Sequence, residues 1–190
     1  TFSKTYSGEG IVISEDKAKG LIIKGVDKNE KRTLEFLKKN LITGSIKNFQ
    51  KNYVFIGTEL AFNLNLEEGD SINLMSSAFV ATPFGSIPQQ DNFAVAAIYN
   101  SGFYEFDQNL IYLDLNDASS LLDKANVDLE IFLPDPFNAE KYKKELKKIY
   151  KNIFIYTWSD LNKSLFSALK VERNVMFIIL TLIIIVAAFN

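Results

Sequence analysis

Ser167 and Lys170 stand in the order Ser-x-x-Lys, the spacing in this chain that comes nearest to a catalytic pattern. Residues three apart share a helix face, so the lysine amine could accept the serine proton, as in penicillin-recognising serine enzymes. The two other signatures of those enzymes, Ser-Asp-Asn and Lys-Thr-Gly, are absent. Because so short a pattern often arises by chance, the sequence favours the polar side of a helix next to a membrane over an active site.

The remaining polar clusters do not fit a metal or phosphate site. Glu67, Glu68 and Asp70 lack the alternating spacing and distal glutamate of a calcium loop, and the Gly-Glu-Gly segment at 8–10 lacks the order of a phosphate-binding loop. The chain has no Cys and no His, which excludes disulfides, triads and zinc sites built on these residues. We therefore predict no catalytic residue, no metal and no cofactor.

The overall composition is that of an ordered protein. The chain has 190 residues, of which 47% are hydrophobic and 23% charged, and its formal net charge is −2. This length suits one domain or two small ones, and the hydrophobic fraction is too high for a disordered chain. A slightly acidic balance disfavours nucleic acid as a partner, because nucleic-acid-binding domains are usually basic.

The end of the sequence is apolar. The last charged residue is Arg173, and the fifteen residues Val175–Phe189 carry no charge. As a helix, such a run would span about 22 Å, whereas a bilayer core is about 30 Å thick. A buried core helix is the alternative, but it would normally show a polar face, and this run offers Thr181 alone. We expect the beginning of a transmembrane helix, cut by the end of the sequence.

Short β-branched runs and amphipathic segments follow each other without a regular strand–helix–strand repeat, which predicts an α+β fold with partly antiparallel sheets. Strands are expected at Gly10–Ser14, Leu21–Val26, Tyr53–Ile56, Ser71–Ser76, Phe93–Tyr99, Leu110–Leu113, Leu129–Leu133 and Ile153–Thr157. Helices are expected after Asp27 or Asn29, over Thr58–Leu66, from Asn116 or Asp117 to Leu122, from Asp135 to about Lys151, and after Ser159 or Asp160. The helix to Lys151 is expected to bury Tyr142, Leu146, Ile149 and Tyr150, and the last one to continue unbroken into the apolar tail.

The connection at 81–92 is longer than most hairpin loops. It carries Pro83 and Pro88, two of the four prolines in the chain. A type I turn is expected from Thr82, with Pro83 and Gly85 at its second and fourth positions. Pro88 has no amide donor, so we expect an arm that does not pair as a regular ladder.

The tip of this arm carries two apolar side chains, Phe84 and Ile87. On a stiffened surface loop, they indicate either a site for a partner or packing back onto the same domain, and composition alone leaves both open. A stiffened arm loses little entropy on binding, which favours a partner, and the flank Gln89–Gln90 can supply hydrogen bonds.

Four segments occur together in a recognisable order. They are Ile-Gly-Thr-Glu-Leu-Ala at 56–61, Thr-Pro-Phe-Gly-x-x-Pro at 82–88, Asp-Pro-Phe-Asn-Ala at 135–139 and Thr-Trp-x-x-Leu-Asn-x-x-Leu-Phe-x-Ala-Leu at 157–169. From about Gly10 to Asn190, the chain resembles the periplasmic domain of a lipoprotein-releasing ABC transporter permease of the LolC/LolE type.

The resemblance implies a fold like the periplasmic core of MacB-type exporters, with a ferredoxin-like porter part and a β-rich sabre part. It implies a periplasmic domain over 1–158, a juxtamembrane helix over 159–174 and the start of a transmembrane helix over 175–190. It further implies a place in the bacterial inner membrane, with this segment in the periplasm.

The same resemblance implies partners. These are the membrane, a lipoprotein substrate, a second permease subunit, a cytoplasmic subunit that hydrolyses ATP, and LolA, a soluble periplasmic lipoprotein chaperone. In the LolC type, a β-hairpin hook captures this chaperone. The residues of this chain that fall on the hook are Pro83, Phe84, Gly85, Ile87, Pro88, Gln89 and Gln90.

Two features bear on the subtype and on docking. LolE-type subunits lack the Pro-Gly-Pro pattern, so the resemblance favours a LolC-like or a hybrid permease. Basic residues accompany the LolC hook, whereas Asn73 and Asp91 stand near those places here, so a charge-assisted contact is expected to be absent or reversed. Two alternatives remain: a related MacB-like exporter or mechanotransmitting permease that contacts another protein, and a membrane-anchored enzyme that uses Ser167.

Overall fold

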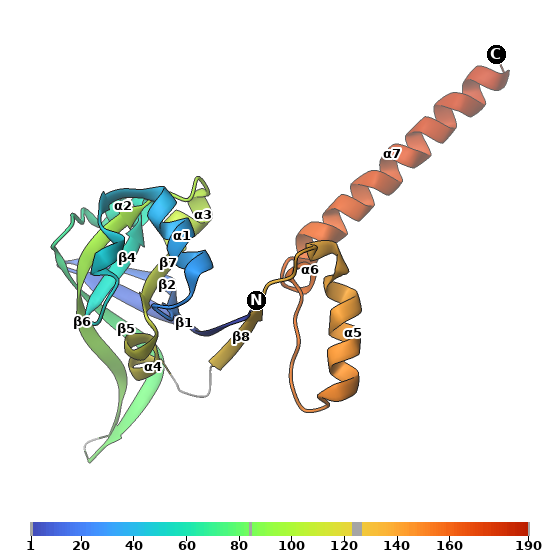
Figure 1. Cartoon of the computed structure of the whole chain (residues 1–190). Helices are drawn as coiled ribbons and strands as arrows, with labels where there is room; N and C mark the ends of the chain where they lie inside the picture. Colours follow the sequence, from blue (N-terminus) through green and yellow to red (C-terminus); the bar gives the residue numbers. More distant parts are fainter. Residues whose placement is uncertain (1, 84, 123–126, 190) are drawn as a thin grey trace. The chain divides into compact units, whose positions relative to one another are not determined.

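The structure, a computed structural model, describes residues 2–83, 85–122 and 127–189. The chain divides into two compact units, Thr1–Ile131 (unit 1) and Phe132–Asn190 (unit 2), which we consider one at a time (Figure 1). Unit 1 combines a mixed sheet with short helices, and unit 2 is helical. The predicted α+β class is therefore confirmed.

The elements of unit 1 follow the expected order with three additions, β3, η1 and α3. They are β1 (Phe2–Ser14), β2 (Lys17–Val26), α1 (Lys31–Asn40), β3 (Leu41–Gly44), η1 (Ile46–Asn48), β4 (Tyr53–Gly57), α2 (Thr58–Leu64), β5 (Ser71–Thr82), β6 (Gly85–Tyr99), α3 (Tyr104–Asn109), β7 (Leu110–Asp114), α4 (Leu115–Leu121) and β8 (Val127–Ile131). The last strand thus begins two residues before the expected Leu129.

The strand pairings close on themselves in the order β1, β2, β7, β4, β6, β5 and back to β1. The β2–β7 and β4–β6 pairs are parallel and the other pairs in this ring are antiparallel. Outside the ring, β3 pairs with β6, and β8 pairs with the first residues of β1. A sheet that closes in this way leaves few unpaired strand edges, so it forms a firm base for any segment that extends beyond it.

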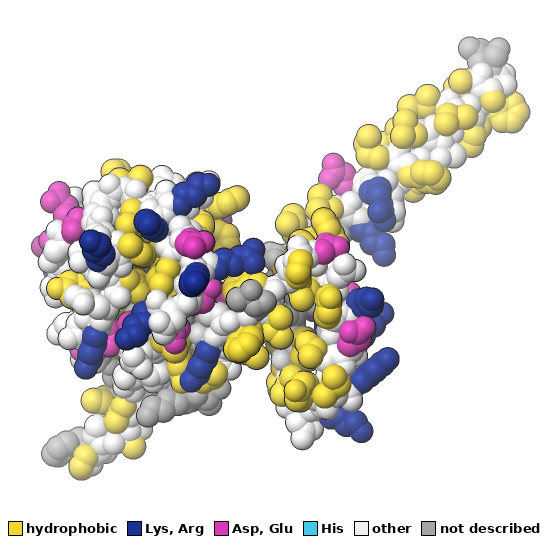
Figure 2. All heavy atoms as spheres, viewed as in Figure 1, with side chains coloured by type: hydrophobic (Ala, Val, Ile, Leu, Met, Phe, Trp, Pro, Cys, Tyr) yellow, Lys and Arg dark blue, Asp and Glu magenta, His cyan; other side chains and the backbone are white. Residues whose placement is uncertain are grey.

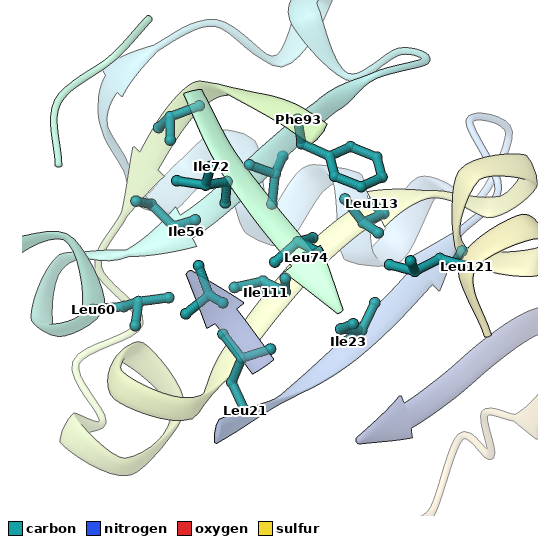
Figure 3. Packing of buried hydrophobic residues seen from close by; sticks show 14 of the residues in the cluster. Leu21, Ile23, Ile56, Leu60, Ile72, Leu74, Phe93, Ile111, Leu113 and Leu121 are labelled. Carbon is teal, nitrogen blue, oxygen red and sulfur yellow. The ribbon is translucent and has the colours of Figure 1, made fainter. Parts of the chain in front are cut away.

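The main core lies on one face of this sheet, beneath α2 and α4. Side chains from several strands meet there, as Figure 3 shows for Ile23, Ile56, Leu74 and Leu113. Leu60 of α2 and Leu121 of α4 complete the cluster from the helical side. Each side chain that leaves water here adds roughly 1.5–3 kcal/mol of hydrophobic stabilisation.

A second core forms on the opposite face because side chains alternate along a strand. Val54 and Ile56 point into the first cluster, and Phe55 between them points into the second. There, the Phe55 ring meets that of Phe49 edge to face, with centroids 5.1 Å apart. Leu37 of α1 covers this side.

Two tyrosines of the second core are protected from ionisation. Burial raises the pKa of the Tyr112 phenol to about 12, and the charges of Glu130 and Asp107 add to this effect. Burial also raises the pKa of Tyr99, whose hydroxyl donates to the Leu110 carbonyl at 2.7 Å.

These raised pKa values predict a loss of stability in alkali. An unfolded tyrosine ionises near pH 10, so between about pH 10 and 12 the unfolded chain loses a proton that the folded chain keeps. We expect the free energy of unfolding to fall over this range, and Tyr112→Phe to make the fall shallower. Urea titrations at a series of pH values check this, and an equal slope in the variant would contradict it.

The helix caps of unit 1 differ from the predicted ones. Glu30 caps α1 by accepting from the amides of Arg32 and Thr33, whereas the expected caps were Asp27 or Asn29. Asp114 caps α4 by accepting from the Asn116 amide, so the cap lies before the predicted position. In both cases, the preceding strand or turn fixes where the first free amides of the helix point.

Unit 2 contains η2 (Pro136–Asn138), α5 (Ala139–Ile149), α6 (Trp158–Leu161) and α7 (Lys163–Phe189). The predicted start at Asp135 is confirmed, since its carboxylate accepts from the Phe137 amide at 3.0 Å and Pro136 follows as the first helical residue. The predicted strand Ile153–Thr157 is wrong, because these residues pair with no strand in the described part of the chain and Thr157 caps a helix instead.

The apolar stripe of α5 is exposed, which corrects the expected burial. All residues of α5 are described and none is buried: Leu146 is half-buried, and Tyr142, Ile149 and the following Tyr150 are exposed. The side-chain hydrogen bonds that hold α5 come from Glu140 and Lys143 in its first turns. The later residues of the helix are therefore left exposed.

A compact polar cluster joins α5 to α6. Thr157 and Asp160 form a capping box, in which each side chain accepts from the backbone amide of the other residue. The Asp160 carboxylate also accepts from Lys143, and the Thr157 hydroxyl donates to Glu140 at 2.8 Å. The predicted caps, Ser159 or Asp160, therefore lie two and three residues past the true one.

Replacing Thr157 by Ala is expected to weaken this joint. Loss of a capping hydroxyl costs about 1 kcal/mol, whereas Thr157→Ser keeps the acceptor and should cost less. Trp158 is the only tryptophan, so its fluorescence during urea unfolding reports on unit 2. Equal midpoints for the Ala variant and the parent would rule out the capping role.

The same cluster responds to acid. The hydrogen bond from Lys143 lowers the pKa of Asp160, and the bonds from Thr157 lower it further. Since an unfolded carboxyl titrates near pH 3.9, the stabilisation is complete above that pH and is lost as the pH falls through the lowered value.

The helix α7 is 27 residues long and its most apolar window has a mean hydropathy of 2.2, with none of it buried. A helix of this length spans about 40 Å, which exceeds the roughly 30 Å of a bilayer core. It is therefore long and apolar enough to cross a membrane, and its exposure argues against a core helix.

The expected unbroken helix from Asp160 is interrupted once. Asn162 separates α6 from α7, and its side chain donates to the Trp158 carbonyl at 2.8 Å. Such a side-chain bond competes with the helical ladder. The helix then continues without a break to Phe189.

Candidate functional site: the β5–β6 hairpin

The strands β5 and β6 extend well beyond the sheet as a two-stranded ribbon. Ser76 is the last residue of β5 that pairs with β1, and β6 pairs with β4 only from Ala94 onward. Between these points and the tip, the described residues of the two strands pair only with each other, out to Thr82 opposite Gly85. At about 3.3 Å per residue, the ribbon reaches roughly 20 Å from the sheet.

The arm was expected not to pair as a regular ladder; it does pair, with a register shift next to Pro88. Pro88 stands opposite Phe79 in the antiparallel register. A strand accepts proline at an edge or at a bulge, and Pro88 adjoins the irregularity that lies between Met75 and Phe79. The segment is therefore a hairpin, as the resemblance implied, with Pro83 and residue 84 between the last paired residues.

Both faces of the ribbon are apolar. Directly opposed residues share a face, so Val80 and Ile87 lie together on one side, and Phe79 and Pro88 on the other. Phe79 is 67% exposed and Ile87 is 55% exposed. Figure 2 shows hydrophobic side chains along this projecting part of unit 1.

The tip is closed by Thr82, whose hydroxyl donates to the Gly85 carbonyl at 2.6 Å. Gly85 has a φ of +125°, a conformation that glycine adopts and that strains residues with a side chain. Pro83 is exposed. Phe84 lies outside the described residues, so its part in the site stays a prediction.

The two glutamines predicted to face a partner lie in different surroundings. The Gln89 side chain donates to the Ser120 carbonyl at the end of α4, so it is engaged within unit 1. Gln90 is exposed and pairs in register with Met75. Of these two, Gln90 is the one whose side chain is open to solvent.

The root of the ribbon holds the two residues that replace expected basic ones. Asn73 stands opposite Asn92 and donates to its side-chain oxygen at 3.0 Å. Asp91 stands opposite Leu74 and accepts from the Asn92 amide at 2.8 Å. From Ser71 to Gln90 the sequence carries no charged residue, so the ribbon has no ionised side chain beyond Asp91.

Two residues of the ribbon were not predicted from the sequence as part of the site. Phe79 and Val80 fall before the segment that was recognised as an arm, and they supply half of its opposed apolar pairs. The run Ala-Phe-Val-Ala at 78–81 is the signal that could have revealed them, since it continues the strand pattern past Ser76.

The other sequence motifs do not assemble into a site. Ser167 and Lys170 are both exposed on α7. Glu67 and Asp70 form a turn in which the Asp70 carboxylate accepts from the Glu67 amide at 2.7 Å. Among the described residues, no group of three or more acidic, His or Cys side chains could hold a metal ion.

Comparison with known proteins shows what the chain as a whole resembles. No protein-family model matches the chain. Over 190 residues, which cover 97% of this chain, it is 30% identical to the lipoprotein-releasing system transmembrane protein LolC of Neisseria meningitidis serogroup B. The chain is thus similar to LolC over nearly its whole length. LolC of Xylella fastidiosa is 27% identical over 189 residues, and LolC of Haemophilus influenzae is 32% identical over 139 residues.

The resemblance to LolC inferred from the motifs is thus confirmed. The chain spans 46% of the length of the LolC proteins of Neisseria and Xylella. Among solved structures, the extracellular domain of the noncanonical ABC-type transporter YknZ from Gram-positive bacteria matches 77% of this chain and 73% of its own, with a TM-score of 0.46 and 11% identity.

Proposed function

We propose that this chain is a periplasmic domain, with the start of the transmembrane helix that follows it, of a permease subunit that releases lipoproteins from the bacterial inner membrane. In this proposal, the β5–β6 hairpin captures a soluble periplasmic lipoprotein chaperone of the LolA type. The observation that carries it is the ribbon itself, which is uncharged from Ser77 to Gln90, leaves the sheet, and is apolar on both faces.

The ribbon suits a protein that carries lipids. A chaperone for acylated proteins needs an apolar surface, and a two-faced ribbon can insert between two walls of such a surface. Val80 and Ile87 would contact one wall, and Phe79 and Pro88 the other. Since the ribbon carries no charge, docking would depend on apolar burial rather than on the charge-assisted contact of the LolC type.

The remaining partners follow from the relation to LolC and from α7. The domain would stand in the periplasm over residues 1–158, residues 159–174 would form the juxtamembrane part, and the rest of α7 would pass into the membrane. ATP would be hydrolysed by a separate cytoplasmic subunit, a second permease subunit would complete the membrane part, and the lipoprotein would be the cargo. Motion would reach the rest of unit 2 through α7 and the adjoining α6, which the cluster around Thr157 and Asp160 ties to α5.

In-cell crosslinking tests this function. A photoreactive residue at Ile87 of the full-length permease is expected to trap a soluble lipoprotein chaperone, since Ile87 would lie inside the docked interface. The matched control is Phe62 on α2, which is 83% exposed and lies outside the hairpin.

The identity of the trapped protein decides between the functions. A chaperone trapped from position 87 and not from position 62 would support lipoprotein handover. An outer-membrane channel or a cell-wall enzyme at position 87 would overturn it in favour of a MacB-like exporter or a mechanotransmitting permease. A chaperone trapped equally from both positions would refute the hairpin as the docking site.

A further inference from the structure

The root of the hairpin is bonded to the carboxyl end of α4. The Ser76 hydroxyl donates to the Leu121 carbonyl at 2.6 Å, and the Gln89 side chain donates to the Ser120 carbonyl. The two bonds come from opposite strands of the ribbon and end on adjacent residues of one helix. The last carbonyls of a helix have no partner within it, so they are free to accept such bonds.

Ser76 also organises the bulge at this point. Three residues of β5, Ser76 to Ala78, face Gln89 alone on β6, because the register shifts between Met75 and Phe79. The Ser76 hydroxyl accepts from the Ala78 amide at 3.1 Å while it donates to α4. A bulge bends a strand and re-aims the residues beyond it, so this hydroxyl connects the bend of the ribbon to the helix.

The helix that receives these bonds is fixed in unit 1. Ala118 and Leu121 are buried in the main core. A Cβ atom added to Gly25 of β2 would lie 2.3 Å from the Ala118 Cβ, so strand and helix are in close contact there. The Asp117 carboxylate accepts from the Asn52 amide at 2.6 Å. The carboxyl end of α4 is therefore a stable point of attachment.

The ribbon needs such an attachment. A hairpin with two strands is marginally stable by itself, and its direction is not set by a sheet once its neighbours end. Next to the two bonds lies a groove, lined by Ser77, Ala78, Phe79 and Gln89 of the ribbon and by Ser119, Ser120 and Leu122 of the α4 side. This groove is the space into which the ribbon could swing if the bonds were absent.

We propose that Ser76 and Gln89 form a latch that sets the direction of the hairpin by bonding it to α4. Gln89 is then a positioning residue rather than a contact for the partner, and Gln90 is left as the exposed amide of the pair. The existence of the latch does not depend on the proposed function. Only its consequence rests on that function: the latch presents the apolar faces to the partner in one orientation.

Distance measurements between spin labels test the latch directly. The chain has no Cys, so Ser86→Cys on the ribbon and Lys51→Cys before β4 can be labelled specifically in the intact chain. In the parent, one narrow distance distribution is expected. Removing both bonds with Ser76→Ala and Gln89→Glu should broaden it, since each lost bond lowers the ratio of latched to unlatched ribbon about fivefold.

Matched variants separate the latch from other effects. Glu at position 89 has nearly the shape of Gln but cannot donate when ionised. Gln89→Lys keeps a donor, so using it in place of Gln89→Glu should restore the narrow distribution. Gln90→Glu adds the same charge one residue away and should leave the distribution narrow. An unchanged distribution in the double variant, or equal broadening by Gln90→Glu, would overturn the latch.

Chaperone binding by the same variants distinguishes the two proposals. If the parent binds the chaperone, the double variant should bind it about fivefold to tenfold more weakly, and Gln89→Lys should recover. If the parent does not bind the chaperone, the proposed function fails, while the distance distributions still decide whether the latch exists.

Discussion

Replacing Ile87 by Asp is expected to weaken chaperone capture at least about 100-fold. Ile87 is half-exposed in the free protein and lies beside Val80, in the middle of one apolar face of the ribbon. An unpaired carboxylate buried against an apolar wall costs several kcal/mol, and every 1.4 kcal/mol is a tenfold change in affinity. The ribbon offers no cation that could pair with it. Titration of the labelled domain with the purified chaperone measures the effect.

Two controls make this result specific. Phe62→Asp places the same charge on an exposed apolar residue outside the hairpin and should leave the affinity within about twofold of the parent. Ile87→Val keeps an apolar side chain and should cost less than about tenfold. A dissociation constant for Ile87→Asp within a few-fold of the parent would show that this face does not bind the chaperone. The same substitution at Phe84, predicted at the tip from the sequence, should have a comparable effect.

Replacing Phe55 by Ala is expected to lower the free energy of unfolding of unit 1 by about 3–5 kcal/mol. Phe55 is fully buried, and it packs edge to face on Phe49. Its strand, β4, joins β6 to β7 in the closed ring of pairings, so a cavity there affects both neighbours. Near-ultraviolet circular dichroism, followed through urea unfolding in mild detergent, measures the effect, since five of the eight tyrosines lie in unit 1.

The matched control is again Phe62, which is exposed on α2. Phe62→Ala should change the stability by no more than about 0.5 kcal/mol, because it opens no cavity. Trp158 lies in unit 2, so its fluorescence shows whether the effect of Phe55→Ala is confined to unit 1. A loss below about 1 kcal/mol would mean that the second core is not packed as the contacts of Phe55 indicate.

Two central strands were predicted to within one residue at their ends. Tyr53–Gly57 and Leu110–Asp114 are short β-branched runs buried on both faces, and such runs have few other ways to fold. The prediction failed for Ile153–Thr157, whose composition also suits a strand, because pairing needs a neighbour that local sequence does not specify. The caps at Glu30, Asp114 and Thr157 were displaced for a similar reason, since several nearby residues could serve as caps.

The candidate site was recognised in part. Pro83, Gly85 and Ile87 marked it, since proline, glycine and an exposed apolar residue in one short segment are unusual. The pairing of Pro88, the role of Phe79 and the internal bond of Gln89 were not predicted, because each depends on a residue distant in sequence. Gln89 and Ser120, for example, are 31 residues apart.

The sequence by itself determined the α+β class, the apolar helix at the end of the chain, the absence of thiol and imidazole chemistry, and the relation to LolC. These properties depend on composition, local periodicity and the order of short motifs, all of which are present in the amino-acid sequence itself. Only the tertiary structure decided that the arm is a ribbon with two apolar faces and that its root is bonded to α4. The physical reason is that strand register and side-chain hydrogen bonds join residues far apart in the chain, so they are settled only when the sheet closes.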